Sequence, residues 1–382
     1  MAKRGQGEGS ISKRPDGTWW ARITIGKTPD GRQKRKAFYG KTRKEVQEKL
    51  TAALNEINNN AYIEPSRILV KDWLETWFSA YKKPFVGAGS QRNIYIHVKM
   101  ICRSDLAYIT LKDISAIQIQ KYINSMIEDK KTTGTISRRF NTLKQALKIA
   151  VENDMIRKNP CEGVKIPKVE YVKANTLSVD EQVKFIEAAK QECHGEVFIL
   201  MLATGIRIGE ALALTWDDID FDNNTLSVNK TLKIADPNKR TSLEVGRPKT
   251  KSSTRIVPLI PSAANLLREH KDIQNKYIAS TKKVYADNNL IFCTRTGTFI
   301  MPNNMRFPFG RILKKIGVEN LHIHCLRHTF ATRCLEKGID IKTTSELLGH
   351  SDISMTANIY THISEERKQD EILKISDTLD CL

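Results

Sequence analysis

The sequence predicts a multi-domain α+β protein: a small three-stranded β-sheet plus helix, then an all-α bundle, then a mixed α+β domain. Three observations favour this division. Residues 1–62 alternate apolar and polar side chains, residues 63–168 follow a helical period, and residues 169–382 combine both patterns. A length of 382 residues suits two or three domains, and a hydrophobic fraction of 40% is enough to build their cores.

The overall charge is strongly positive. Lysine and arginine outnumber aspartate and glutamate by 62 to 43, a formal net charge of +19 that is not confined to a tail. We therefore expect a nucleic-acid partner first, and a basic ribosome-associated or surface-binding protein as the alternative. No apolar run approaches the roughly 20 residues of a membrane span, and the N-terminus lacks an apolar signal-peptide core. A cytoplasmic protein without a membrane partner is expected.

The seven cysteines are scattered singly along the chain. None forms a C-x-x-C pair, which argues against a zinc site or a redox centre and favours reduced thiols. We expect neither a metal nor an organic cofactor.

Residues 1–62 form the most basic part of the chain. Three short alternating runs, separated by the turn sequences PDG and TPDG, predict an antiparallel meander. Thr42 is the expected N-cap of the helix that follows. Val46, Leu50 and Leu54 have helical spacing and would cover one face of the sheet. The other face is expected to carry cations, either solvated or laid in a DNA groove: Arg22, Arg32, Lys34 and Lys36.

Residues 63–168 contain four helical segments separated by Gly, Pro or polar residues, which predicts a helical bundle. The last segment has one apolar stripe, made of Ile136, Phe140, Leu143, Leu147 and Ala150. Its remaining surface carries cations available for phosphates: Arg138, Arg139, Lys144 and Lys148. Residues 157–170 hold two prolines and several charges, and are predicted to be a linker.

Residues 169–382 begin with a capping box formed by Ser178 and Glu181. The apolar run EVFILMLATG predicts a buried helix that ends at Gly205. Two strand-like stretches follow, on either side of a long basic loop at residues 235–253. The rest of this part is predicted to be helical.

Arg207 follows a Thr-Gly break near the start of a predicted helix. Ala203, Ala211 and Leu214 place it on an apolar face, where a buried arginine is costly unless an anion or carboxylate meets it. Glu210, one turn further on, is placed either to orient the guanidinium toward an anion or to form a purely structural pair.

His324 and Arg327 lie three residues apart at a predicted helix start, so they share one face. A helix N-terminus favours phosphate, and a guanidinium adds bidentate contacts. The alternative is a metal site formed by His322, His324 and His328. That interpretation lacks a nearby acidic ligand, and Arg327 would repel the cation.

The stretch LGHSDISMTANIYTH ends one helix at Gly349. His350 follows at once, and Ser351 is the expected cap of a short helix that carries Tyr360. A phenol with a pKa of about 10 is a poor nucleophile at neutral pH and needs activation. Two arginines, two histidines and a tyrosine supply what attack on a phosphodiester requires. Since the sequence has no obvious paired-carboxylate metal site, the arginines would take the place of a metal ion.

The motifs TGIRIGEALAL, HCLRH and LLGHS, with Tyr360 at the end, resemble the tyrosine recombinases, specifically the phage-type and conjugative-transposon integrases. The resemblance covers essentially the whole chain. It implies an arm-type DNA-binding domain at residues 1–62, a core-binding helical domain at 63–168 and a catalytic domain at 169–382. It also implies site-specific DNA cleavage and rejoining through a covalent 3′-phosphotyrosine, without metal or ATP.

The resemblance gives each catalytic residue a role. Tyr360 matches the nucleophile, while Arg207 and Arg327 match the pair that grips the scissile phosphate. His324 matches the general base and acid. His350 matches the second histidine, which hydrogen-bonds the phosphate.

The family also has a lysine that protonates the leaving 5′-oxygen, in a β-hairpin before an R-x-V-P-L strand. Lys249 and Lys251 both fit, and Lys249 is preferred because it precedes a threonine ahead of the turn. One departure is Gly209, where many relatives have serine. It costs helix stability on the order of 1 kcal/mol but removes no catalytic group.

The expected function is integration of a phage or mobile element in a bacterial host. The expected partners are double-stranded DNA with core and arm attachment sites, three further copies in a homotetramer, an excisionase or directionality factor, and a host DNA-bending protein. Ile372, Ile375 and Leu379 suggest a tail that docks on a neighbouring subunit or packs in cis. Alternatives are a resolvase or invertase with the same chemistry, a type IB topoisomerase, and a non-catalytic DNA-binding regulator. The basic N-terminal module favours integration.

Overall fold

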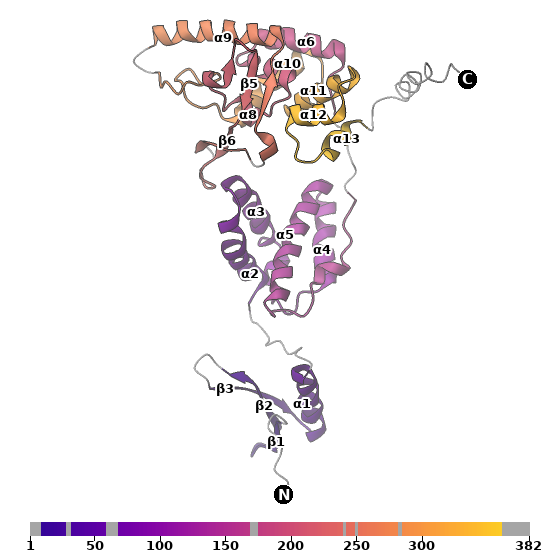
Figure 1. The fold of residues 1–382 in the computed structure, drawn as a ribbon. Helices are drawn as coiled ribbons and strands as arrows, with labels where there is room; N and C mark the ends of the chain where they lie inside the picture. Colours follow the sequence, from indigo (N-terminus) through magenta and orange to yellow (C-terminus); the bar gives the residue numbers. More distant parts are fainter. Residues whose placement is uncertain are drawn as a thin grey trace, which may run out of the picture. The chain divides into compact units, whose positions relative to one another are not determined.

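The computed structural model describes residues 9–27, 32–58, 68–168, 175–239, 242–248, 251–281 and 285–360 (Figure 1). It divides into two compact units, Met1–Glu170 and Tyr171–Leu382. Buried apolar side chains form one cluster in the N-terminal sheet, one in the helical bundle and one in the second unit. No helix in these ranges is both long enough and apolar enough to cross a membrane.

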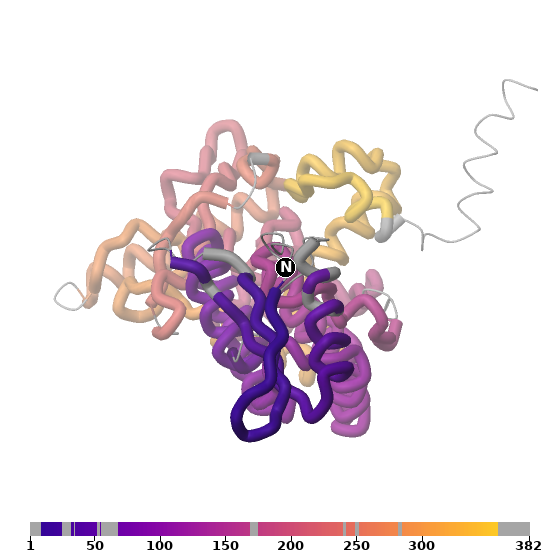
Figure 2. Tube along the Cα trace, turned by 90° about the horizontal axis from the view of Figure 1, so that it is seen from below, coloured from indigo at the N-terminus to yellow at the C-terminus, as the bar shows by residue number. Residues whose placement is uncertain are grey.

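The N-terminal strands form an antiparallel sheet in the order β1-β2-β3, which confirms the predicted meander. The following helix packs Val46 and Leu50 onto Ala21 and Ile23 of the central strand, and Figure 2 shows the helix beside the sheet. Thr42 Oγ1 accepts a hydrogen bond from the Glu45 amide at 3.2 Å, which confirms the N-cap. The elements are β1 (Ser10–Lys13), β2 (Trp19–Lys27), β3 (Gln33–Gly40) and α1 (Arg43–Asn58).

The strand register decides which cations lie on the uncovered face of this sheet. Ile23 is buried against α1 and pairs with Lys36, so both lie on the covered face. Arg22 is exposed and pairs with Ala37, which places it on the uncovered face. The prediction that Lys36 lines the uncovered face is therefore wrong, because its position in the register puts it opposite a core residue. Arg35, one residue earlier, lies on the uncovered face instead.

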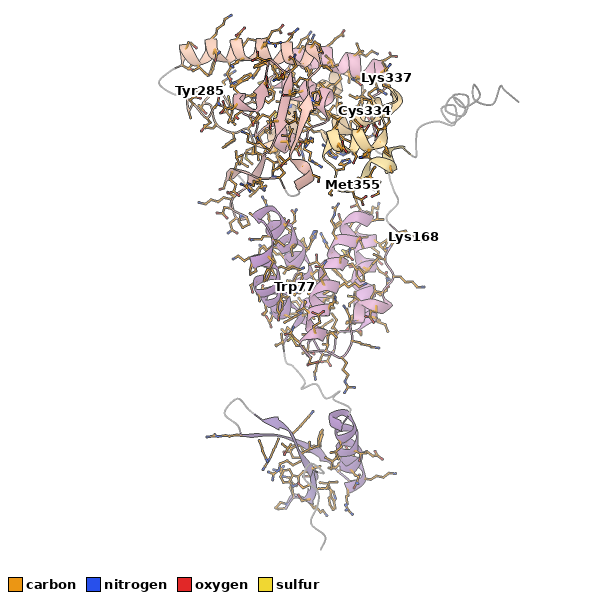
Figure 3. The ribbon with its side chains drawn as sticks, viewed as in Figure 1. Trp77, Lys168, Tyr285, Cys334, Lys337 and Met355 are labelled. Atoms are coloured by element: carbon orange, nitrogen blue, oxygen red, sulfur yellow. The ribbon has the colours of Figure 1, made fainter. Side chains whose placement is uncertain are left out.

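The helical bundle follows the predicted pattern. Its long last helix buries all five residues of the predicted apolar stripe. Trp77 is 1% exposed in the bundle core (Figure 3), and Trp73 Nε1 donates to the Ala146 carbonyl at 2.9 Å. The elements are α2 (Val70–Trp77), a π-helical turn η1 (Phe78–Lys82), the short 3₁₀ turns η2 (Lys83–Phe85) and η3 (Asp105–Tyr108), α3 (Ala88–Ile101), α4 (Ala116–Glu128), α5 (Thr133–Glu152) and η4 (Pro160–Gly163).

The predicted linker is wrong as far as residue 168, where the described part of it ends. Cys161 is buried in the bundle core, and Val164 and Ile166 pack against that core. The Gln120 side chain accepts from the Lys165 amide at 2.8 Å and donates to its carbonyl at 3.0 Å. Apolar residues between the prolines and charges return the chain to the bundle.

The second unit holds a sheet of order β4-β5-β8, a separate β6-β7 hairpin and surrounding helices. Its elements are α6 (Val179–Lys190), α7 (Gly195–Thr204), α8 (Ile208–Ala211), η5 (Trp216–Asp218), β4 (Ile219–Asp220), β5 (Thr225–Val228), β6 (Thr231–Ile234), β7 (Leu243–Gly246), η6 (Lys251–Ser253), β8 (Arg255–Pro258), α9 (Pro261–Ser280), η7 (Pro302–Met305), α10 (Arg306–Ile316), α11 (His324–Glu336), α12 (Ile341–Leu348) and α13 (Ser354–Tyr360).

Two predictions in this unit are confirmed and one is wrong. Ser178 and Glu181 form the capping box, and Gly205 ends α7 with a φ of +66°. The long basic loop predicted at residues 235–253 contains a strand, β7, which pairs with β6. Leu243 packs against the core, while Glu244 and Val245 are exposed, so only the first residue of this strand is held by the core.

Candidate active site

Arg327 is the most deeply buried cation of the predicted site. It lies in the first turn of α11 with 1% of its surface exposed. Its Nη1 donates to the Gly205 carbonyl at 2.7 Å, and its Nη2 donates to the Leu348 carbonyl at 2.5 Å. Both acceptors lie at helix C-termini, Gly205 as the C-cap of α7 and Leu348 as the last residue of α12, where partial negative charge suits a cation. Burial, followed by the charges of Arg207 and Arg255, lowers the pKa of Arg327 to about 9, so it stays charged at neutral pH.

Arg207 stands at the N-cap position of α8 and is half-buried. Its Nη1 donates to Glu210 Oε1 at 2.7 Å, and its own amide donates to Glu210 Oε2 at 3.0 Å. Glu210 is 2% exposed. Burial raises the pKa of Glu210, but the charges of Arg255 and Arg207 and their hydrogen bonds outweigh burial and lower it. The carboxylate is therefore ionised and fixes the Arg207 guanidinium.

The two predicted histidines are kept uncharged by the same surroundings. His350 is partly buried just after α12, and burial followed by the charge of Arg327 lowers its pKa to about 3. The pKa of His324 is lowered to about 4. The first cause is dehydration of the ring by its neighbours, although the residue is exposed, and the charges of His328 and Arg327 lower the pKa further. Arg207 acts on both histidines as well. Two arginines and two neutral imidazoles thus lie close enough together to influence one another.

The helix that carries Tyr360 is tied to this group. α13 packs against α11 and α12, and Tyr360 is its last residue. Thr356, fully buried on α13, places its Oγ1 2.8 Å from His350 Nδ1. The predicted cap is wrong: Asp352 Oδ1, not Ser351, accepts from the Ser354 amide, at 2.9 Å. Nothing beyond the backbone is described for Tyr360.

The predicted acid is only partly within the described residues. Lys249 lies outside them. Lys251 begins the short turn η6, but its side chain is not described. The choice of Lys249 over Lys251 stays a prediction.

The alternative interpretation of the histidines as a metal site finds no geometric support. His322 Nδ1 lies 3.1 Å from Cys325 Sγ, and the rings of His324 and His328 meet edge to face with centroids 4.7 Å apart. In the part of the chain that the structure describes, no three His, Cys, Asp or Glu side chains are arranged to hold a metal ion.

The predicted DNA-binding residues of the sheet lie in different surroundings. Arg22 is exposed, and its guanidinium lies 5.3 Å from the Trp20 ring centre. Arg32 is exposed just before β3, and the Lys34 side chain is not described. Lys36 lies 5.3 Å from the Phe38 ring centre on the covered face.

The predicted DNA-binding residues of the bundle are mostly exposed. Arg138, Lys144 and Lys148 are on the surface, and Lys148 forms an ion pair with Glu152 at 3.6 Å. Arg139 is half-buried. Its Nη1 lies 3.6 Å from the Met126 sulfur, and among the described residues its buried Nε has no hydrogen-bond partner.

The sequence motifs do not predict the contacts that two further residues make in the site. Arg255 contacts Glu210 and α12, and Thr356 contacts His350. In the sequence, Arg255 is the first residue of the R-x-V-P-L strand motif, which gives no indication of its contacts. Thr356 gives none either, because a threonine in a short polar helix is ordinary.

Comparison with known families agrees with this geometry. The model described as "Phage integrase family" matches residues 175–367, and "Phage integrase SAM-like domain" matches residues 75–166. A "Tyrosine recombinase XerC-like" protein of Caldanaerobacter subterraneus subsp. tengcongensis is 34% identical over 374 residues, which cover 93% of this chain and 95% of the relative. The "Tyrosine recombinase XerC" of Pediococcus pentosaceus is 27% identical over 68% of this chain and 82% of its own.

Solved structures share the fold. The Tn1549 transposon integrase in complex with a circular intermediate DNA aligns with a TM-score of 0.69 at 21% identity, covering 81% of this chain and 99% of that one. A lambda integrase dimer bound to a COC′ core site aligns with a TM-score of 0.58 at 18% identity, covering 91% and 93%. The arrangement of a small N-terminal sheet, a helical bundle and a mixed α+β unit is therefore that of these integrases.

Proposed function

Because the chain belongs to the phage integrase family of tyrosine recombinases, we propose that it is a site-specific DNA integrase in which Tyr360 forms a covalent 3′-phosphotyrosine. One observation carries this proposal most directly. Arg327 on α11 donates to the carbonyls of Gly205 and Leu348, each two residues before Arg207 or His350, and the Tyr360 helix packs against α11 and α12. The family relationship indicates the reaction, and this group of side chains provides the charges and proton acceptors that the reaction needs.

The proposed chemistry divides among these groups. The Tyr360 oxygen bonds to phosphorus while the bond from phosphorus to the 5′-oxygen breaks, leaving a 5′-hydroxyl. Arg207 and Arg327 neutralise the phosphate oxygens, a preorganised stabilisation that is strong in a partly dehydrated site. His324, neutral at pH 7, takes the tyrosine proton, and His350 donates to a phosphate oxygen. Lys249 or Lys251 protonates the leaving 5′-oxygen. Attack by a new 5′-hydroxyl reverses every step and rejoins the strand.

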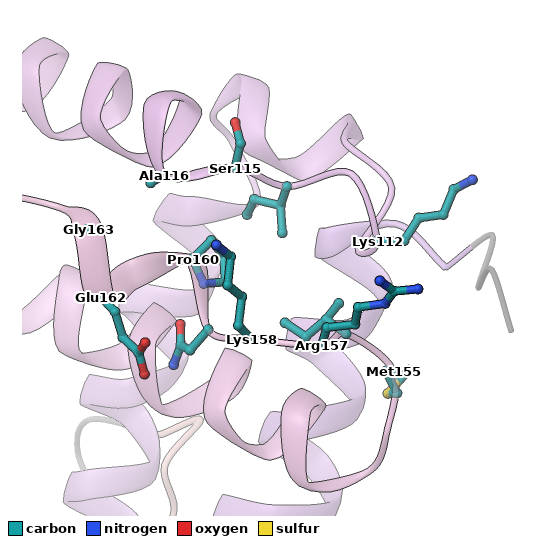
Figure 4. A pocket seen from close by; sticks show the side chains of 12 residues that line it. Lys112, Ser115, Ala116, Met155, Arg157, Lys158, Pro160, Glu162 and Gly163 are labelled. Carbon is teal, nitrogen blue, oxygen red and sulfur yellow. The ribbon is translucent and has the colours of Figure 1, made fainter. Parts of the chain in front are cut away.

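The three predicted domains would share the DNA. Residues 1–62 would address arm sites through the uncovered face of the sheet, with Arg22 and Arg35 as its cations. Residues 63–168 would hold the core site through Arg138, Arg139 and Lys144. A pocket of about 540 Å³ in the bundle is lined by three cations, Lys112, Arg157 and Lys158, and by one carboxylate, Glu162 (Figure 4). Catalysis would belong to residues 169–382.

The proposed partners follow from strand exchange. DNA binding and oligomerisation accord with the family, and exchange of four strands calls for a homotetramer on two DNA sites. A directionality factor and a host DNA-bending protein would determine whether integration or excision occurs. The protein would work on the DNA of a bacterial host.

The decisive experiment is covalent trapping on a nicked core-site duplex. The natural chain should form a DNA adduct that survives denaturation, also in excess EDTA. Tyr360→Phe should form none while keeping its affinity, and Tyr277→Phe, at a partly exposed tyrosine of α9, should behave as the natural chain. An adduct with Tyr360→Phe, or one that needs Mg²⁺, would refute the mechanism.

The same assay identifies the acid. A 5′-thio leaving group needs little protonation, because thiols ionise near pH 8.5. It should restore cleavage to Lys249→Ala. Rescue of Lys251→Ala alone would transfer the role to Lys251.

A second function is favoured by the XerC-like relative, namely resolution of repeated sites within one molecule. Recombination of two sites on one plasmid, compared with two sites on separate molecules, distinguishes these readings. Efficient exchange only within one plasmid would favour resolution. Relaxation of supercoils without any exchange would indicate a topoisomerase.

A further inference from the structure

Arg255 joins three pieces of the site through hydrogen bonds of its side chain. It begins β8, and its side chain is 6% exposed. Its Nη2 donates to Glu210 Oε2 at 3.1 Å, and its Nε donates to the Leu347 carbonyl at 2.6 Å. Its Nη1 donates to the Ser253 carbonyl at 3.1 Å. Each guanidinium nitrogen therefore has a protein partner, and three of the five N–H groups are used within the protein.

Each of these partners belongs to an element that carries a site residue. Glu210 holds Arg207 through its other oxygen. Leu347 precedes Leu348, whose carbonyl binds Arg327. Ser253 ends the turn η6, the stretch that includes the candidate acid Lys251 and directly follows Lys249.

Gly349, just before His350, lies against Arg255 and the turn η6. A Cβ on residue 349 would lie 2.9 Å from Arg255 Nη1 and 2.9 Å from the Ser252 carbonyl. Gly349 also has a φ of +65°, which a side chain disfavours. The close approach of η6, Arg255 and the His350 segment thus depends on a residue without a side chain.

The charge arrangement has a second consequence. One buried carboxylate, Glu210, lies between two guanidinium groups. If Arg255 were absent, Glu210 would neutralise Arg207 alone, and the pair would attract a phosphate less. With Arg255 present, one positive charge remains in excess of the carboxylate.

We propose that Arg255 is a positioning residue that fastens the lysine-bearing turn to α12 and to the Arg207–Glu210 pair, so that the acid reaches the phosphate that the arginines hold. This inference rests on the proposed function and adds a residue to it. The contacts to Ser253 and Leu347 position the turn, and the contact to Glu210 supports Arg207.

The test compares oxygen and sulfur leaving groups in single-turnover cleavage of a nicked core site. Arg255→Met should lower the rate about a hundredfold with a 5′-oxygen, within the range of a lost general acid. With a 5′-sulfur the loss should be only about tenfold, the remainder reflecting the weaker Arg207 grip. DNA affinity should change less than twofold. Arg255→Lys, which keeps the charge but not the forked contacts, should fall between Arg255→Met and the natural chain.

A matched control separates positioning from a general loss of stability. Arg311 forms a bidentate pair with Glu192 on the exposed side of the same unit. Arg311→Met should leave both cleavage rates unchanged. Should Arg255→Met fail to fold, the double variant Arg255→Met/Glu210→Gln removes the unpaired buried carboxylate, and it should still show a larger loss with oxygen than with sulfur.

Equal losses with oxygen and sulfur, in whichever variant folds, would overturn the proposal, as would a rate within threefold of the natural chain. A parallel fall in DNA affinity would overturn it too, because Arg255 would then be a phosphate ligand. Absence of a Tyr360 adduct in the natural chain would instead refute the proposed function itself.

Discussion

The N-terminal sheet and the candidate active site both carry arginines, but they hold them in opposite ways. Arg22 is exposed on the uncovered face of the sheet and lies over the Trp20 ring. Arg327 is 1% exposed and is fixed by two carbonyls from two helix ends. The apolar cores that support the two sets of arginines also differ in size. Four buried apolar residues support the sheet, while a far larger cluster supports the unit that holds Arg207 and Arg327.

This difference indicates two uses of the same side chain. An exposed guanidinium is screened by salt and adds to affinity mainly by releasing counterions. A buried one is dehydrated and immobile, so it stabilises charge at one position without reorganising. Arginines of the sheet should therefore affect affinity and its salt dependence, and arginines of the catalytic site should affect rate.

The largest effect is expected at Arg327. Arg327→Lys keeps a charge but loses the second carbonyl contact and the planar donor fork. Cleavage of a nicked core site should fall about a thousandfold, the upper range for loss of one preorganised donor. Affinity should fall less than threefold. The measurement is single-turnover adduct formation beside a binding titration. Equal losses in rate and affinity would remove the distinction between buried and exposed arginines.

The next effect concerns the N-terminal module. Deleting residues 1–62 should abolish arm-site binding and efficient integration, while Tyr360 still cleaves a nicked core site. Each phosphate contact adds about 0.9 to the slope of log affinity against log salt, so about five contacts cost on the order of a hundredfold or more over a fourfold rise in salt. Recombination of full attachment sites by the shortened chain, at the natural rate, would refute the arm-binding role.

Single substitutions sharpen the same point. Arg22→Met should lower the arm-site salt slope by about 0.9. Lys36→Met is the matched control, because Lys36 lies on the helix-covered face and should not change the slope. A slope that responds to Lys36 and not to Arg22 would contradict the assignment of the faces.

The sequence predicted what depends on local pattern. The meander, the Thr42 cap, the Ser178–Glu181 box and the end of α7 at Gly205 follow from turn residues, side-chain spacing and capping chemistry, and the structure contains all of them. A strand register is not local, since a shift by one residue exchanges the faces. The sequence pattern therefore predicts the wrong face for Lys36.

The site shows the same limit. The candidate catalytic residues are predicted from their motifs, but Arg255 bonds to residues up to 92 positions away along the chain. Its partners are a carboxylate and two carbonyls, and backbone carbonyls leave no trace in a sequence. Cys161 is a similar case: prolines and charges around it suggest a linker, yet it is buried in the bundle core.

A smaller effect on the cleavage rate is expected at the contact between Thr356 of α13 and His350. Thr356 and Thr344 are both fully buried, but Thr356 hydrogen-bonds His350, while Thr344 Oγ1 has no hydrogen-bond partner among the described residues. Thr356→Val should slow cleavage about tenfold, in line with one lost hydrogen bond of about 1–1.5 kcal/mol. Thr344→Val should be neutral or slightly stabilising. Equal rates in the two variants would show that Thr356 does not orient His350.

The smallest expected effect is on stability as a function of pH, and it again separates the two regions. His350 and His324 have their pKa values lowered to about 3 and about 4, from an ordinary 6.5, chiefly because neighbouring groups dehydrate the two rings. Residues 1–62 contain no histidine. As the pH falls below 6.5, the unfolded chain binds protons that the folded catalytic unit does not, so the free energy of unfolding of that unit decreases. The decrease should continue until the folded pKa values are reached.

Calorimetry of the full chain between pH 7.5 and 5.0 measures this, because most carboxylates stay ionised in that window. The transition of the catalytic unit should move to lower temperature by several degrees, and His350→Gln should reduce the shift by removing one of the groups. The transition of the N-terminal module should move little. Bound core-site DNA should reduce the shift as well, since a phosphate beside the imidazoles favours their protonated form and raises their pKa. A catalytic transition that is independent of pH would mean that the histidines are not dehydrated in the folded chain, and the contrast between a buried and an exposed cationic surface would then rest on the arginines alone.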